Sequence, residues 1–291
     1  MALTANFIDS KWNLHKRILS FTTVENHRGE TIDKTIEKNL KSSGIDKVMT
    51  LTVDNASSND TTMTYLVKRF SSGLLLKGEF LHIRCCAHIL NFIVCDAFKE
   101  HYDCISRIRN AVRFVRSSPA RAMKFKKCIK IEKISCKSLV CLDISTRWNF
   151  TYMMLDAATK FEKTFDRLED EEPTFASECQ PTKNYWENDR LLFRFLEVFY
   201  NVTLKVSGSL YSTSNVIFRQ ISTTHNCIQE NSMDNENLIF VNVVKSMEAK
   251  FDKYWGNNEK TNLLLYVAVV LDPRYKLRLL SYLFQQVVRA I

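Results

Sequence analysis

The stretch Lys47–Asn59 constrains the fold more than any other part of the chain. It alternates apolar and β-branched residues up to Val53, and Asp54 then begins a run of small polar residues. This pattern predicts a strand that ends in a carboxylate, and ligands of open α/β sheets bind at the carboxyl ends of strands. A simpler role fits the same spacing, in which Asp54 caps a helix that begins near Asn59.

Strands and helices of ordinary length are predicted around this stretch. Turn residues and apolar spacing predict strands at 3–9 and 12–23, a helix from Thr31 to Gly44, a helix at 61–70, a strand at 80–85 and a helix from Cys86. In this β-β-α-β order, the strand before Asp54 should pair with a central strand, and that central strand should precede the first hairpin in the sequence. We therefore expect a mixed α/β fold that lacks its first strand.

The rest of the chain is predicted to be helical. Helices are expected after Arg107, from Ser145, and over 186–206, 214–229, 237–255 and 275–288, with an apolar stretch at 263–271. The acidic run Asp166–Glu172, which prolines follow, predicts an exposed loop. We expect two regions, 1–100 and 101–291.

The positive charge of the chain is concentrated in one region. The net charge is +9, and residues 61–140 contain 16 Lys or Arg against 5 Asp or Glu. Such a local basic field suits a polyanion, most simply nucleic acid, although a solvated basic face is equally consistent. On a helical wheel Arg109, Arg113 and Arg116 lie within about 60° of one another, beside a stripe that is expected to be buried.

Composition argues against several other classes of protein. There is no apolar run of about 18 residues, no signal core within residues 1–20 and no glycine-rich phosphate loop, so we expect no membrane partner and no small-molecule substrate. Nine irregularly spaced cysteines indicate free thiols in a reducing compartment. Cys85 and His88 have the spacing of half a zinc site, but no second ligand pair accompanies them, and buried thiols are the simpler interpretation.

Seven motifs in order resemble the plant hAT-superfamily transposases and the related RICESLEEPER and DAYSLEEPER zinc-finger BED proteins. They are Thr4–Asp9, Ile45–Asn59, Arg84–Asn91, Ser145–Asn149, Ser207–Tyr211, Lys250–Trp255 and Val270–Lys276. The resemblance implies a truncated RNase H-like (retroviral-integrase-like) fold with a large all-helical insertion at 101–291. In that family three acids hold two divalent ions, Mg²⁺ or Mn²⁺, for DNA cleavage and transfer.

The resemblance also assigns roles to single residues. Asp54 matches the second acid, a catalytic metal ligand, and His88 would lie near the scissile phosphate. Arg147 and Trp148 are expected to bind nucleic acid, and Trp148 matches the aromatic that stacks on a flipped base. Without the resemblance, His88 is equally a core or capping histidine, and Trp148 an anchor of the helical core. The Asp-x-Trp motif of the first acid is absent, and we expect the third acid, the dimerisation segment and the BED finger to lie outside these residues.

The sequence thus predicts a nuclear, hAT-transposase-derived DNA-binding protein that is catalytically inactive and needs no cofactor. Homo-oligomers are implied only for full-length relatives. Two alternatives stay open: a fragment of an active transposase that cuts and joins DNA by two-metal phosphoryl transfer, and a remnant that serves protein association alone. Unpaired strand edges also predict poor folding of this chain by itself.

Overall fold

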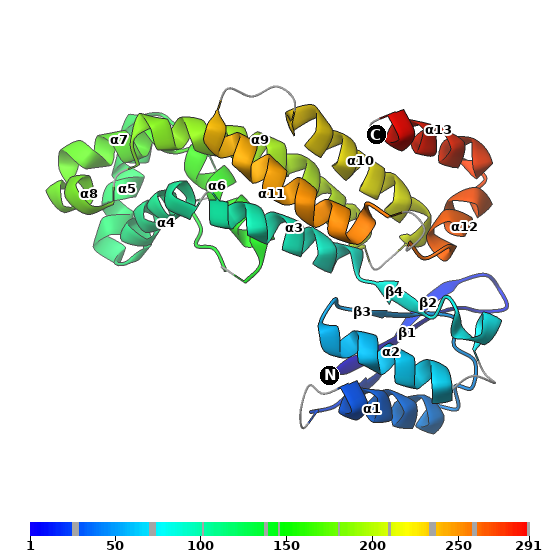
Figure 1. Cartoon of the computed structure of the whole chain (residues 1–291). Coiled ribbons are helices and arrows are strands. Elements are labelled where there is room, and N and C mark those ends of the chain that lie inside the picture. Colours follow the sequence, from blue (N-terminus) through cyan, green and yellow to red (C-terminus); the bar gives the residue numbers. More distant parts are fainter. Residues whose placement is uncertain are drawn as a thin grey trace. The chain divides into compact units, whose positions relative to one another are not determined.

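The computed structural model describes residues 1–24, 29–69, 74–100, 102–136, 139–144, 146–179, 181–208, 211–232, 237–257 and 261–289. The chain forms two compact units, whose elements are labelled in Figure 1. Unit 1 comprises Met1–Ile89, Leu204–Ser222 and Asn257–Ile291, and unit 2 comprises Leu90–Thr203 and Thr223–Gly256. These units do not follow the expected division at residue 100, because the last part of the chain packs with the first.

The strands of unit 1 form two separate pairs. β1 (Ala2–Ile8) and β2 (Leu14–Phe21) are an antiparallel hairpin, whose turn is held by the Asp9 carboxylate: it accepts hydrogen bonds from the backbone N–H groups of Lys11 and Asn13 at 2.9 and 2.8 Å. β3 (Leu51–Val53) and β4 (His82–Arg84) pair in parallel. The predicted strand before Asp54 is therefore confirmed, although its paired part is only three residues long.

Two helices cover this part of unit 1 and lie side by side in Figure 1. α1 (Gly29–Ser42) and α2 (Ser57–Arg69) bury Ile36 and Leu66 in a small core, to which Leu74, just before the short helix η1 (Leu75–Gly78), also contributes. The fully buried Asp33 on α1 has Arg69 Nε at 3.7 Å, and the same guanidinium donates to Glu37 at 2.6 Å. A shared arginine thus joins the two helices.

The end of the chain completes unit 1, which the sequence did not predict. The Asn262 side-chain amide donates to the backbone carbonyls of Phe80 and His82 at 3.1 and 3.0 Å, which fixes the start of α12 (Leu264–Leu271) at β4. α12 packs with α13 (Lys276–Arg289) and the first part of α10 (Ser214–Ser232), where the rings of Phe218 and Tyr266 meet edge to face at 4.8 Å.

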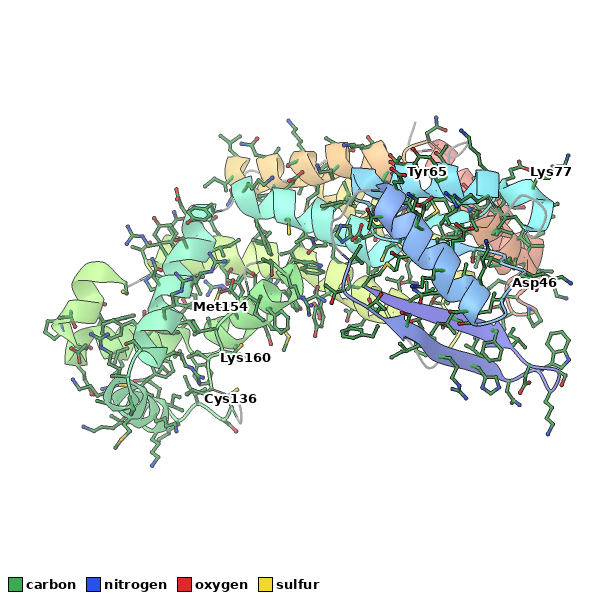
Figure 2. All side chains as sticks on the ribbon, turned by 90° about the horizontal axis from the view of Figure 1, so that it is seen from below. Asp46, Tyr65, Lys77, Cys136, Met154 and Lys160 are labelled. Atoms are coloured by element: carbon green, nitrogen blue, oxygen red, sulfur yellow. The ribbon has the colours of Figure 1, made fainter. Side chains whose placement is uncertain are left out.

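All secondary-structure elements described in unit 2 are helices, joined by turns and loops. These helices are α3 (Cys86–Glu100), α4 (Tyr102–Arg116), α5 (Pro119–Ile131), α6 (Trp148–Thr159), α7 (Glu162–Glu171), α8 (Pro173–Glu178), α9 (Lys183–Val206) and α11 (Leu238–Trp255). Three helices, α3, α9 and α10, have residues in both units. Phe125, Phe165 and Trp186 form its aromatic interior. In Figure 2 Met154 lies within the bundle, and Lys160 at its surface. Across the described chain, no helix is both long and apolar enough to cross a membrane.

The predicted loop at Asp166–Glu172 is wrong. These residues lie largely in α7, because Phe165 and Leu168 are three positions apart and are both buried, while the acids occupy other faces of the helix. Apolar anchoring at helical spacing outweighed the charge run that suggested a loop.

Candidate nucleic-acid interface

Asp54 lies directly after β3 and is exposed to solvent. One of its carboxylate oxygens, Oδ1, accepts a hydrogen bond from the Ala56 N–H at 3.1 Å and another from the Asn59 side-chain amide at 2.6 Å. Asn59 also donates to the backbone carbonyl of Asp54. The carboxylate thus holds the turn that precedes α2. Its donors are the N–H of Ala56, one residue before α2, and a side-chain amide, rather than a backbone N–H of the helix as in the expected cap. Its role as a metal ligand stays a prediction.

His88 lies at the same end of the parallel pair as Asp54. Val53 of β3 is paired with Arg84 of β4, and the Cys85 N–H donates to the Val53 carbonyl at 3.0 Å. α3 then begins at Cys86, so His88 sits in its first turn and is partly buried. Asp54 and His88, to which the resemblance assigns roles, therefore both follow the carboxyl ends of β3 and β4. Parallel strands bring such ends to the same side of a sheet.

A second polar cluster, formed by Asp60, His82 and Arg84, lies beside β4. Asp60 of α2 has the Arg84 guanidinium at 3.4 Å and the His82 imidazole at 3.9 Å. Burial lowers the pKa of His82, the positive charge of Arg84 lowers it further, and Asp60 opposes both. In the part of the chain that the structure describes, no three His, Cys, Asp or Glu side chains are grouped so that they could hold a metal ion. These residues do not fit a two-metal centre.

Arg109 has a structural role in unit 2. Its guanidinium donates three hydrogen bonds of 2.8 to 3.1 Å to Asp143, and the side chains of the pair are only 13% and 3% exposed. The Thr151 hydroxyl donates to the same carboxylate at 2.9 Å. These bonds, together with burial, leave Arg109 unsuited to a DNA phosphate. The apolar stripe predicted beside it is confirmed, since Ile108 and Val112 are fully buried.

Trp148 is likewise enclosed by its own unit. Its side chain is 2% exposed, and its ring meets Tyr152 and Tyr200 edge to face at 6.2 and 6.4 Å between ring centroids. Tyr152 in turn stacks on Phe193 and Tyr200. Trp148 therefore anchors α6 in the helical core in this structure, and stacking on a base would require its exposure.

The other predicted arginines reach solvent. Arg113 and Arg116 on α4 and Arg147 before α6 are exposed, and none has a carboxylate partner among the described residues. All three arginines remain candidates for phosphate contacts.

A further basic surface lies on α5, within the segment from Arg107 to Lys137 whose excess of positive charge the sequence already indicates as a source of phosphate contacts, although its single lysines were not named as candidates. Lys126, Lys127 and Lys130 are exposed along one side of this helix, and no described carboxylate pairs with them. We call these three residues the α5 lysine face. Their spacing of three and four is the sequence signal that could have identified them.

Neighbouring charges of the segment are already paired. Lys124 is bound to Glu172, and Arg121 stacks on the ring of Phe114, 3.8 Å from its centroid. Glu132, the one acid between residues 107 and 137, is bound to Arg167 of α7. Because that acid is neutralised, the positive charge of the α5 lysine face is left uncompensated within its own segment. Lys137 lies outside the described residues.

Three family models match successive parts of the chain. The ZBED1 RNase-like domain matches residues 1–80, the ZBED1 RNase-like helical domain matches residues 83–195, and the hAT-like transposase RNase-H fold matches residues 215–290. The third match places RNase-H-fold residues within the segment expected to be a helical insertion only. It agrees with the packing of α12 and α13 in unit 1.

Curated relatives match over almost the whole chain. The zinc finger BED domain-containing proteins RICESLEEPER 2 and RICESLEEPER 1 of Oryza sativa subsp. japonica are each 32% identical over 99% of this chain. DAYSLEEPER of Arabidopsis thaliana is 24% identical over 98% of it. The chain spans about 40% of the length of each of these relatives.

Proposed function

Because the chain belongs to the hAT-like transposase family, we propose that it is a transposase-derived protein that binds DNA through helices α4 and α5. The observation that carries the proposal is the concentration of exposed cations, which have no carboxylate partner among the described residues, on α4, on α5 and just after α5: Arg107, Arg113, Arg116, Lys126, Lys127, Lys130 and Lys133. Cations of this kind bind phosphates and release condensed counterions, which gives affinity without sequence preference.

Lys126→Ala, Lys127→Ala and Lys130→Ala, combined in one variant, are expected to weaken binding to duplex DNA. Each phosphate contact contributes about 0.9 to the slope of log K against log salt concentration, so losing three contacts lowers the slope by about 2 to 3. Fluorescence anisotropy with a labelled duplex, measured between low and physiological salt, gives the affinity and its salt slope. The effect is expected to be the same for duplexes of unrelated sequence.

A matched control removes the same charge elsewhere. Lys205, Lys245 and Lys253 are exposed on other helices, and their combined replacement by alanine is expected to leave the slope within about 1 of the wild-type value. Arginine at the three α5 positions should keep the slope. Equal losses in the two alanine variants would mean that net charge alone attracts DNA, and no binding at low salt would refute the proposed function.

We also propose that these 291 residues bind DNA without cutting it. The proposal is supported by Asp54, whose Oδ1 is already occupied by two hydrogen-bond donors of its own turn. In a nicking assay on supercoiled plasmid with Mg²⁺ or Mn²⁺, the wild type and Asp54→Asn are expected to give equal nicking, at the level of protein-free buffer. Metal-dependent nicking that Asp54→Asn abolishes would instead establish the transposase activity.

The nucleus is the compartment that we propose. All nine cysteines are free thiols, as a reducing compartment favours, and the proposed partner is chromosomal DNA.

A further inference from the structure

The turn between α4 and α5 contains a serine that is followed directly by proline. The four prolines of the sequence follow Ser118, Glu172, Gln180 and Asp272, so Ser118 is the one hydroxyl residue that precedes a proline. Arg121 stands three positions after it. The order serine, proline, any residue, arginine is the substrate pattern of proline-directed protein kinases.

This pattern has a physical basis in how such a kinase binds its substrate. An ordinary residue after the phosphorylated serine would bury its backbone N–H against the kinase without an acceptor, whereas proline has no N–H to leave unpaired. A basic side chain at the third position adds a charge-assisted hydrogen bond to an acidic group of the enzyme. Pro119 and Arg121 supply both features.

The turn is accessible in the structure. Ser117, Pro119 and Ala120 are exposed, and Ser118 is partly exposed. The backbone of Ser118 is extended, with φ of −151° and ψ of 154°, and its hydroxyl oxygen accepts a hydrogen bond from the Arg121 N–H at 3.2 Å. A kinase binds its substrate as an extended chain, so the first turn of α5 has to open, and the ends of helices open at low free-energy cost.

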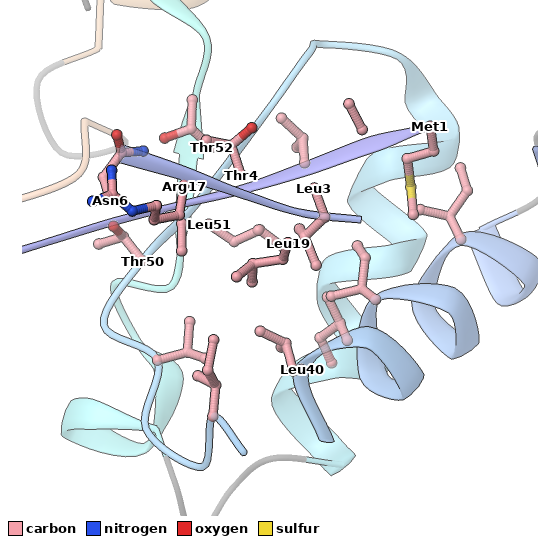
Figure 3. A pocket seen from close by; sticks show the side chains of 18 of the residues that line it. Met1, Leu3, Thr4, Asn6, Arg17, Leu19, Leu40, Thr50, Leu51 and Thr52 are labelled. Atoms are coloured by element: carbon pink, nitrogen blue, oxygen red, sulfur yellow. The ribbon is translucent and has the colours of Figure 1, made fainter. Parts of the chain in front are cut away.

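Hydroxyl groups in unit 1 provide a contrast. Thr4, Thr50 and Thr52 line a cavity of about 1380 Å³ together with apolar side chains such as Leu3 and Leu19 (Figure 3). None of these threonines precedes a proline. A proline-directed kinase is therefore expected to leave them unmodified.

We propose that Ser118 is a phosphorylation site for a proline-directed protein kinase, and that its phosphate weakens DNA binding by α4 and α5. The Ser118 Oγ attacks the γ-phosphorus of ATP, the bond from that phosphorus to the ADP oxygen breaks, and the hydroxyl proton passes to the catalytic base of the kinase. The phosphorylation itself does not depend on DNA binding, whereas its consequence rests on the proposed function.

Arginines near Ser118 connect the modification to the proposed interface. The Arg121 guanidinium reaches back to the turn and donates to the Ser117 hydroxyl at 2.8 Å. Arg113 and Arg116, in the last turn of α4, are exposed and have no described carboxylate partner. A phosphoserine brings a charge of about −1.5 to −2 and three acceptor oxygens. It thus competes with DNA phosphates for the cations at the end of α4.

The first arm of the test measures phosphorylation of the whole chain by ATP and a purified cyclin-dependent kinase. Mass spectrometry is expected to locate a phosphate on Ser118, and none in Ser118→Asn, where asparagine keeps the helix cap. Pro119→Ala retains the hydroxyl but should lower kcat/KM for phosphorylation at least tenfold, while Ser117→Ala should leave it unchanged. A phosphate on Ser117 in place of Ser118, no phosphate at all, or a Pro119→Ala protein that reacts at the wild-type rate would overturn the proposal.

The second arm compares DNA binding before and after kinase treatment by fluorescence anisotropy with a labelled duplex. Loss of about two phosphate contacts should lower the slope of log K against log salt concentration by about 2, and weaken binding at physiological salt roughly tenfold or more. Ser118→Asp and Ser118→Asn both keep the cap and differ in charge, so their slopes are expected to differ by about 1. An unchanged DNA affinity of fully phosphorylated protein would overturn the regulatory role.

Failure of the proposed function gives a different result. A protein that binds no DNA at low salt before kinase treatment would refute DNA binding and its regulation together, while mass spectrometry would still report the phosphate on Ser118. Kinase treatment that weakens DNA binding of Ser118→Asn as much as that of the wild type would assign the effect to another residue, and would overturn the proposal.

Discussion

Arg109→Ala is expected to lower the free energy of unfolding of unit 2 by about 3–5 kcal/mol. The variant leaves the Asp143 carboxylate, whose side chain is 3% exposed, without its three hydrogen bonds from the guanidinium. Burial raises the pKa of Asp143, but the Arg109 bonds outweigh burial and hold that pKa below its ordinary value. Urea unfolding followed by tryptophan fluorescence reports the loss, because Trp148, Trp186 and Trp255 all belong to unit 2.

Arg113→Ala is the matched control for this variant. Arg113 lies one helical turn further along α4 and is exposed, so its removal is expected to change stability by no more than about 0.5 kcal/mol. Replacing both Arg109 and Asp143 by leucine should recover much of the stability, since no buried charge then lacks a partner. An Arg109→Ala protein that is as stable as wild type but binds DNA more weakly would contradict this structural role and would show that Arg109 contacts DNA.

Asp189→Asn is expected to stabilise unit 2 above neutral pH by on the order of 4 kcal/mol. Asp189 on α9 is fully buried, and burial raises its pKa to about 7, against the Thr159 hydrogen bond and the Arg190 charge that lower it. Its other carboxylate oxygen, Oδ1, has no hydrogen-bond partner among the residues that the structure describes. Ionisation of this carboxyl group in the folded state is therefore costly.

The direction of the pH dependence follows from the two pKa values. Between the ordinary value of 3.8 and about 7, the folded protein holds a proton on Asp189 that the unfolded chain has released. Stability consequently falls as the pH rises through this window, and the full loss is present above pH 7. Asparagine carries no charge at any pH, so this part of the slope should vanish in Asp189→Asn, while the two proteins are expected to be equally stable near pH 3.5.

Urea titrations between pH 4 and pH 8 measure this difference. Asp103→Asn serves as a control, because it removes a carboxylate at an exposed position of α4. This variant is expected to keep the pH dependence of the wild type. A wild-type slope that Asp189→Asn leaves unchanged would show that Asp189 is not the group responsible.

Local patterns were sufficient to predict most elements of the fold. The period of two before Asp54 and the period near 3.6 in α1, α4, α9 and α11 are fixed by neighbouring residues, so the sequence displays them directly. α7 was missed because two buried residues, Phe165 and Leu168, outweighed a run of charges. The position of α12 was missed because Asn262 bonds to β4 across 180 residues or more of sequence, and no local period reports a partner so distant.

The same limit applies to the site residues. Sequence spacing showed that Arg109, Arg113 and Arg116 share one side of α4, but only the fold shows that Asp143 lies against the first of them. Trp148 has the sequence context of a base-stacking residue, yet Tyr152 and Tyr200 enclose it. The α5 lysine face, by contrast, could have been derived from spacing alone once the helix boundaries were known.

Lysine acetylation with and without DNA is the most direct test of the proposed interface. The protein is treated with a limiting amine-reactive acetate in the presence or absence of a duplex, at low salt, and modification of each lysine is quantified by mass spectrometry. We expect DNA to protect Lys126, Lys127 and Lys130, and to leave Lys245 and Lys253 as reactive as in the free protein. Uniform protection of all five lysines, or protection of Lys245 and Lys253 alone, would contradict DNA binding through α5.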